Sequence, residues 1–200
     1  MGEQPIAAYI YAGILAEKPV NCRKKQPGTL PMSRLLLLRH AKAIWPKPGM
    51  KDFDRPLDRE GQSSLDRLAQ AMKASSLYPD LVVLSGSCRT RETAFGLIER
   101  LEIEVPTVID DTIYSGSAAD YMKAVTKHRD AQRLMLVGHN PSMEDLALAL
   151  CGNGMKDGLL KLRAGFPTAA LATIVFEGPL SELEHGSGYL ESFPLSRKNS

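Results

Sequence analysis

Apolar residues along the chain follow two different spacings, and the two spacings alternate. The continuous apolar run at residues 35–38 and the largely apolar runs at 80–84 and 133–137 are typical of strands buried on both faces. Between them, apolar positions recur every three or four residues, as at Leu65 and Leu68, which predicts amphipathic helices. The same reasoning predicts helices over 89–101, 118–128 and 142–150, and further strands over 107–109, 169–176 and 189–193.

This order of elements predicts an α/β fold. Strands that alternate with helices form parallel pairs joined by right-handed crossovers. We therefore expect a three-layer sandwich in which a mostly parallel central sheet is flanked by helices. The helix at 89–101 is expected to direct five apolar side chains inward: Ala94, Phe95, Leu97, Ile98 and Leu101.

The chain has 200 residues, which suits one domain with a sizeable core. Met32 directly precedes the first strand-like run. Residues 1–31 are therefore expected to form a poorly ordered N-terminal extension, and residues 32–200 the domain. The apolar run at 5–16 follows Glu3 rather than a basic segment, which argues against a secretory signal. No run is long enough to cross a bilayer, so no membrane partner is expected.

Charge and cysteine content narrow the function classes. The 25 basic and 23 acidic residues leave a net charge of +2, too even to predict nucleic-acid binding through bulk charge. Three scattered cysteines and four histidines show no spacing typical of a disulfide framework or a metal site. We therefore expect no metal, no cofactor and a reducing, cytoplasmic location. Nothing in the sequence predicts an obligate interface, so a monomer is expected.

Polar clusters follow the three clearest apolar runs. The first is Arg39-His40-Ala41, the second spans residues 85–93, and the third is Gly138-His139-Asn140-Pro141. The carboxyl ends of parallel strands meet at one edge of a sheet, where ligands of open α/β sheets bind. One histidine or arginine at a strand end is usually an ordinary surface residue. The coincidence at three strand ends favours a shared pocket.

Such a pocket suits phosphoryl transfer. The transferred group carries negative charge on its non-bridging oxygens, and a guanidinium fork can bind two of them at once. A neutral imidazole can attack phosphorus and divide one difficult step into two easier ones.

Four segments resemble motifs of the histidine phosphatase superfamily, in the same order. Arg39-His40-Ala41 is similar to its Arg-His-Gly signature, and Gly138-His139-Asn140-Pro141 to its second histidine motif. Asp54-Arg55-Pro56-Leu57, followed by Glu60-Gly61, resembles the segment leading into the family's first helix. Residues 89–94 resemble its Arg-Ala-x-Gln-Thr-Ala element. The resemblance covers residues 32–193 and is greatest to the short SixA-type phosphohistidine phosphatases.

The resemblance implies a role for four residues. His40 would be the nucleophile, Arg39 and Arg89 would hold the phosphoryl oxygens, and His139 would also hydrogen-bond the phosphoryl group. Arg91 falls on a variable position of the motif and is expected to face solvent or a nearby acid. The departures from the family pattern, such as alanine at position 41, do not touch the proposed phosphate ligands.

A general acid is harder to assign. The candidates are Asp54 and Asp111, followed by Asp110 and Glu144, although each also suits a surface or capping role. An alkoxide leaving group needs a proton donor, whereas the imidazole of a phosphohistidine can take up its own proton. A site without a dedicated acid would therefore suit phosphohistidine better than an ordinary phosphate ester.

Several functions stay open at this point. The leading one is hydrolysis of phosphohistidine on a phosphorylated protein, such as a histidine phosphotransfer domain. The alternatives are a phosphatase for small phosphate esters, a mutase that retains the phosphoryl group, and a phosphate-binding module without turnover. A mutase benefits from a closed site, and this chain has little room for an insertion that would cover the pocket.

Overall fold

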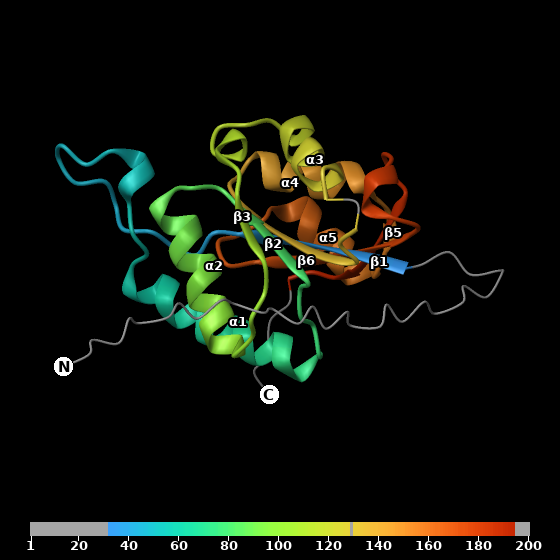
Figure 1. Ribbon diagram of the computed structural model, residues 1–200, viewed down its shortest axis with the longest axis horizontal. Helices are drawn as coiled ribbons and strands as arrows, with labels where there is room; N and C mark the ends of the chain where they lie inside the picture. Colours follow the sequence, from blue (N-terminus) through green and yellow to red (C-terminus); the bar gives the residue numbers. More distant parts are fainter. Residues whose placement is uncertain (1–31, 129, 195–200) are drawn as a thin grey trace, which may run out of the picture.

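The structure is a computed structural model that describes residues 32–128 and 130–194. The expected extension at 1–31 lies outside these residues. The strands form one sheet in the order β3-β2-β4-β1-β6-β7-β5 (Figure 1). Their bounds are β1 Met32–Arg39, β2 Leu81–Leu84, β3 Thr107–Ile109, β4 Arg133–Gly138, β5 Cys151–Gly154, β6 Leu171–Glu177 and β7 Gly188–Ser192.

The half of the sheet that contains β3, β2, β4 and β1 is parallel. β1 lies parallel to β4, β4 to β2 and β2 to β3, whereas β6 is antiparallel to both β1 and β7. The prediction of an α/β fold with a mostly parallel sheet is confirmed. Because β1, β4 and β2 are neighbours and parallel, their carboxyl ends lie side by side.

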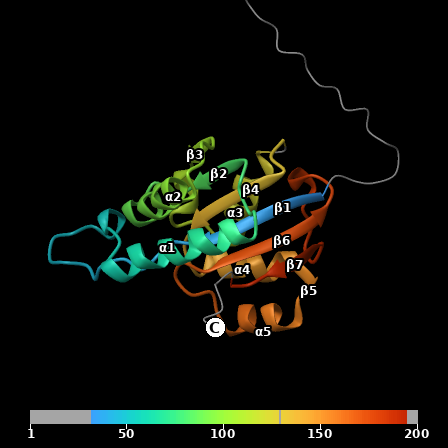
Figure 2. The ribbon, with the colours of Figure 1, turned by 90° about the horizontal axis from the view of Figure 1, so that it is seen from below.

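Helices cover both faces of the sheet, because successive side chains of β1 point to opposite faces and are apolar on both. Leu36 and Leu38 pack against one face with helices α1 and α2, and Leu35 and Leu37 pack against the other. Figures 1 and 2 show α1 and α2 on one side of the sheet and α3 and α4 on the other. The bounds are α1 Arg59–Ala74, α2 Cys88–Leu101, α3 Ala118–Thr126, α4 Ser142–Leu150 and α5 Lys156–Ala164.

Phe95 corrects one sequence expectation. Its side chain is 46% exposed, whereas Ala94, Leu97 and Leu101 are buried against the sheet. These three positions recur at a spacing of three and four residues, and Phe95 lies outside that stripe. Ile98 is half-buried at the edge of the stripe.

The sequence pattern also missed two elements, β5 and α5. β5 contains Gly152 and Gly154 and has only partly buried or exposed positions, so it carries no alternating pattern. Short 3-10 turns, which no apolar periodicity marks, lie at Asp52–Asp54 (η1), Asp111–Ile113 (η2) and Leu180–Glu182 (η3). Within the described residues, no helix has the length and apolarity needed to cross a membrane.

The segment between β1 and α1 extends away from the sheet, as Figure 2 shows, and carries η1. The C-terminal end of this segment is anchored where α1 begins, because the Asp58 carboxylate accepts the Gly61 N–H at 2.7 Å. Gly61 also packs against the backbone carbonyl of Lys42, where an added Cβ would lie only 2.2 Å from that oxygen. The segment is therefore tied to the residues that follow His40.

Candidate active site

The three strand ends meet as their parallel pairing requires. His40 follows β1 and His139 follows β4, and the His40 N–H donates to the Gly138 carbonyl oxygen at 3.0 Å. The centroids of the two imidazole rings are 5.2 Å apart. Ser85, which follows β2, lies within 3.0 Å of His139 through its hydroxyl oxygen. The structure therefore brings together polar clusters that are about fifty residues apart in the sequence.

His40 is held with one ring nitrogen occupied. Its Nδ1 lies 2.8 Å from the Ala41 carbonyl oxygen, which only accepts, so Nδ1 carries the hydrogen and Nε2 keeps a free lone pair. Burial, opposed by the Ala41 bond and reinforced by the positive charges of Arg89, Arg39 and Arg55, lowers the pKa of His40 to about 4. The ring is neutral at pH 7, as a nucleophile must be.

His139 is fixed by its ring and by its backbone. Nε2 is 3.0 Å from Ser85 Oγ, and the backbone N–H donates to the Tyr121 hydroxyl oxygen at 2.8 Å. Burial lowers the pKa of His139 to about 3, and the charges of His40 and Arg89 act in the same direction. When Ser85 donates to Nε2, the neutral ring carries its hydrogen on Nδ1.

Two arginines flank the histidines, each held at one end. Arg39 donates from Nη1 to the Phe166 carbonyl oxygen at 2.6 Å. Arg89, only 7% exposed, donates from Nη1 to the Asp52 carbonyl oxygen at 2.6 Å and from Nη2 to Asp52 Oδ2 at 2.9 Å. These bonds fix the planes of both guanidinium groups before any ligand arrives.

Two guanidinium donors and, when Ser85 donates to His139 Nε2, one imidazole donor are buried in this region without a partner. Among the described residues, Arg39 Nε, Arg89 Nε and His139 Nδ1 are buried side-chain atoms without a hydrogen bond. A buried donor without a partner costs free energy, so a group of them indicates a place for an acceptor. The positive charges of Arg39 and Arg89 also lower the pKa of both His40 and His139. A tetrahedral oxyanion supplies acceptors in several directions and suits this arrangement.

The acid candidates occupy different surroundings. Asp111 lies near the site, and its Oδ1 accepts the Gly86 N–H at 3.1 Å. Asp54 is exposed and lies with Arg91 along a neighbouring hollow. Asp110 caps η2 and pairs with Lys127, and Glu144 accepts from Asn140 and from the Phe166 N–H.

None of the four has a hydrogen bond to His40 or His139 among the described residues. The assignment of Asp54 or Asp111 as the acid therefore stays a prediction. Arg91 is exposed, in agreement with its expected position.

Sequence reasoning missed three residues of the site. Asp52 binds Arg89, Tyr114 lies with its ring edge-on to His139 at 5.4 Å, and Tyr121 holds the His139 backbone. Tyr121 belongs to the apolar stripe of α3, and Asp52 and Tyr114 lie in or beside short 3-10 turns. No spacing in the sequence distinguishes them from ordinary core or surface residues.

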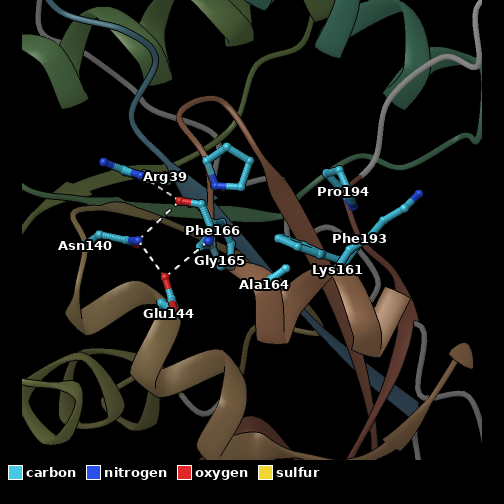
Figure 3. Close-up of a pocket in the computed structure, with 10 residues that line it drawn as sticks. Arg39, Asn140, Glu144, Lys161, Ala164, Gly165, Phe166, Phe193 and Pro194 are labelled. Carbon is cyan, nitrogen blue, oxygen red and sulfur yellow. Dashed lines mark hydrogen bonds between the residues drawn. The ribbon is translucent and has the colours of Figure 1, made fainter. Parts of the chain in front are cut away.

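A second hollow, larger than the one beside Asp54, opens next to Arg39 (Figure 3). Its volume is about 570 Å³. In Figure 3 the Phe166 carbonyl lies between Arg39 and Asn140, and Glu144 binds Asn140 from below. The lining also includes Lys161, Ala164, Gly165, Pro167, Phe193 and Pro194. Arg39 therefore borders both the oxyanion position and a mostly apolar space next to it.

Comparisons with known proteins agree with this geometry. Residues 35–114 match the model of the histidine phosphatase superfamily (branch 1). The candidate phosphohistidine phosphatase SixA from Agrobacterium tumefaciens is 32% identical, with a TM-score of 0.69 over 80% of this chain and 96% of that one. A structure of the protein histidine phosphatase SixA complexed with tungstate matches at 16% identity and a TM-score of 0.64, over 80% and 96% of the two chains, and supports the fold alone.

A chloroplast protein of Arabidopsis thaliana is 30% identical over 140 residues, which are 65% of this chain and 64% of that relative's length. The match thus spans about two thirds of that relative. With the motifs, the family model and the SixA structure from Agrobacterium tumefaciens in agreement, the chain belongs to the histidine phosphatase superfamily and is a phosphatase of its SixA-type branch.

Proposed function

We propose that this phosphatase hydrolyses phosphohistidine on a phosphotransfer protein, with His40 as the nucleophile and without a metal ion. One observation carries the proposal: a neutral, half-buried His40 lies among three buried nitrogens that have no partner and that act as donors when Ser85 donates to His139 Nε2. The donors are Arg39 Nε, Arg89 Nε and His139 Nδ1. A phosphoryl group placed there would satisfy all three and present its phosphorus to the free Nε2 of His40.

The reaction would then run in two balanced steps. His40 Nε2 attacks phosphorus, its bond to phosphorus forms, and the bond from phosphorus to the substrate imidazole breaks. The departing ring nitrogen takes a proton from solvent water, and that proton is returned when the product of the second step ionises to hydrogen phosphate. Water next attacks the phosphorus on His40, so that inorganic phosphate leaves and neutral His40 returns. The arginines and His139 would stabilise the charge on the equatorial oxygens in both steps.

The surroundings of the acidic residues support phosphohistidine over an ester. Asp52 is held ionised by arginines, which keep its pKa well below the usual range, so it cannot donate a proton. Glu144, Asp110 and Asp111 are occupied by their own partners, and Asp54 is exposed along the neighbouring hollow. An imidazole leaving group needs less help from an acid than an alkoxide, because its own nitrogen takes up the proton.

A small phosphate ester is the second candidate substrate, and the pocket beside Arg39 favours it. A space of about 570 Å³ with an apolar lining could hold the organic part of such an ester. We also propose that the enzyme acts in the cytoplasm, since Cys88 and Cys151, the cysteines of the described residues, are both free thiols. A module that binds phosphate without turnover is the alternative that a kinetic test must exclude.

The test compares two substrates in the presence of EDTA. A phosphohistidine-bearing protein and an aryl phosphate are incubated with the wild type and with His40→Ala, and released phosphate is measured. We expect the wild type to cleave the phosphohistidine and the variant to be at least about a thousandfold slower. A radioactive phosphoryl group should be trapped on the wild type in an acid-labile form and not on the variant.

His185→Ala is the matched control, because His185 is an exposed histidine outside the site. It should keep the wild-type rate. Cleavage of the ester alone would move the substrate class to the second candidate. A His40→Ala variant as active as the wild type, or a wild type that cleaves neither substrate, would refute the proposal.

A further inference from the structure

Asp52 is the charged residue of the site that the proposed reaction does not use. It lies in η1, on the segment that extends from the sheet. Its Oδ2 accepts from Arg89 Nη2 at 2.9 Å and from the Tyr114 hydroxyl at 2.9 Å, and its Oδ1 accepts from Arg55 Nη1 at 2.7 Å. One carboxylate therefore joins two arginines and a tyrosine at the border of the oxyanion position.

We propose that Asp52 is a built-in counter-anion that weakens the hold of the site on phosphate and so sets the affinity for substrate and product. The inference rests on the proposed role of Arg89 as a phosphoryl ligand. The positive charge of Arg89 is shared between two anions once a phosphoryl group enters. The phosphoryl group must then bind beside the negative charge of Asp52, which stays in place because it belongs to the protein.

The field of Asp52 reaches the reacting groups. The negative charge of Asp52 raises the pKa of His139, against the lowering caused by burial and by the neighbouring positive charges. The Arg89 side chain is only 8% exposed, so water screens its interaction with Asp52 less than it screens a surface pair. A charge felt by the His139 ring is felt more strongly by a dianion bound to Arg89 and His139.

A carboxylate beside Arg89 would also help the enzyme to release its product. Buried guanidinium groups with free donors bind phosphate strongly, and inorganic phosphate is the product of the second step. A site with Arg39 and Arg89 unopposed would release that product slowly. A nearby carboxylate lowers the affinity for every phosphate species while leaving the donor geometry at Arg89 in place.

The test measures binding of tungstate, a tetrahedral dianion, by calorimetry, so that no hydrolysis is required. Asp52→Asn keeps an oxygen acceptor and removes the charge. We expect it to bind tungstate about fivefold to tenfold more tightly; the figure is modest because the Asp52 side chain is 53% exposed. Inhibition by inorganic phosphate should strengthen by the same factor. Asp52→Glu, which keeps the charge, should restore the wild-type affinity.

Asp66→Asn is the matched control. Asp66 is paired with Arg100 at 2.6 Å and is 58% exposed, but it lies on α1 away from the oxyanion position. It should leave the tungstate affinity unchanged. η1 contains no buried residue, so Asp52→Asn should fold, and Asp52→Ala provides a second variant with the same expected direction.

The inference is overturned if Asp52→Asn and Asp52→Ala bind tungstate as the wild type does or more weakly. It is also overturned if Asp66→Asn tightens binding equally, since net charge alone would then explain the result, or if none of the proteins binds tungstate. Failure of the proposed function gives a different result. A protein that cleaves no phosphohistidine but still shows tighter tungstate binding in Asp52→Asn contradicts the substrate assignment and supports the counter-anion.

Discussion

Tyr121→Phe offers a test of how the second histidine is held. Tyr121 is fully buried in α3, and its hydroxyl oxygen accepts the backbone N–H of His139 at 2.8 Å. The phenylalanine ring fills the same space, so the substitution removes the hydroxyl and little else. Gly138 confirms how closely the backbone approaches, because a Cβ at this position would lie 2.5 Å from the Tyr121 hydroxyl oxygen.

Tyr121→Phe should lower stability because it leaves the backbone N–H of His139 without an acceptor. His139 is only 8% exposed, so its N–H cannot turn to water, and a buried donor without a partner costs about 1–3 kcal/mol. The second bond of the hydroxyl, to the His139 carbonyl oxygen at 3.4 Å, is too long to add much. We expect Tyr121→Phe to lower the free energy of unfolding by about 2 kcal/mol, or the melting temperature by about 4–8 °C.

The assay is urea denaturation of both proteins, together with the rate of phosphate release. The denaturation midpoint should fall with an unchanged slope, and activity should fall as well, because the imidazole of His139 loses its backbone support. Tyr78→Phe is the control. Tyr78 is half-buried, and its hydroxyl has no hydrogen bond within the described residues, so stability should change by less than about 0.5 kcal/mol. Equal effects in the two variants would refute the reasoning.

Two further predictions concern pH and packing. The folded-state pKa is lowered to about 4 for His40 and to about 3 for His139, so the stability they contribute is complete above about pH 6.5 and is lost as the pH falls toward 3–4. The melting temperature should fall over that range, and less steeply in His40→Gln; a rise on acidification would contradict the assignment. Gly61→Ala should destabilise by about 1–3 kcal/mol despite its better helix propensity, because the new Cβ would meet the Lys42 carbonyl oxygen. Gly96→Ala, which meets only side-chain ends, should be neutral or stabilising in the same urea titration, and equal losses would argue against this packing.

The sequence alone determined most of the strands and the three strand ends that carry the candidate site residues. Runs such as 35–38 and 134–137 are apolar throughout because these parts of β1 and β4 are buried on both faces, and this pattern is local. A parallel sheet places these strand ends at one edge, and the position of β1 next to β4, which the structure gives, brings His40 beside His139. Elements with a weak local pattern were missed: β5 is rich in glycine and only partly buried.

Only the tertiary structure decided which groups support the reacting residues. Arg89 and Asp52 are separated by 37 positions, and His139 and Ser85 by 54, so no short spacing records either contact. Phe95 was assigned inward because it is apolar, yet the face of α2 that meets the sheet is set by packing against β2 and β4 rather than by side-chain type. Local hydrophobicity fixes where strands and helices lie, because it depends on near neighbours. The partners of a buried charge or donor depend on which distant segments the fold brings within hydrogen-bonding distance.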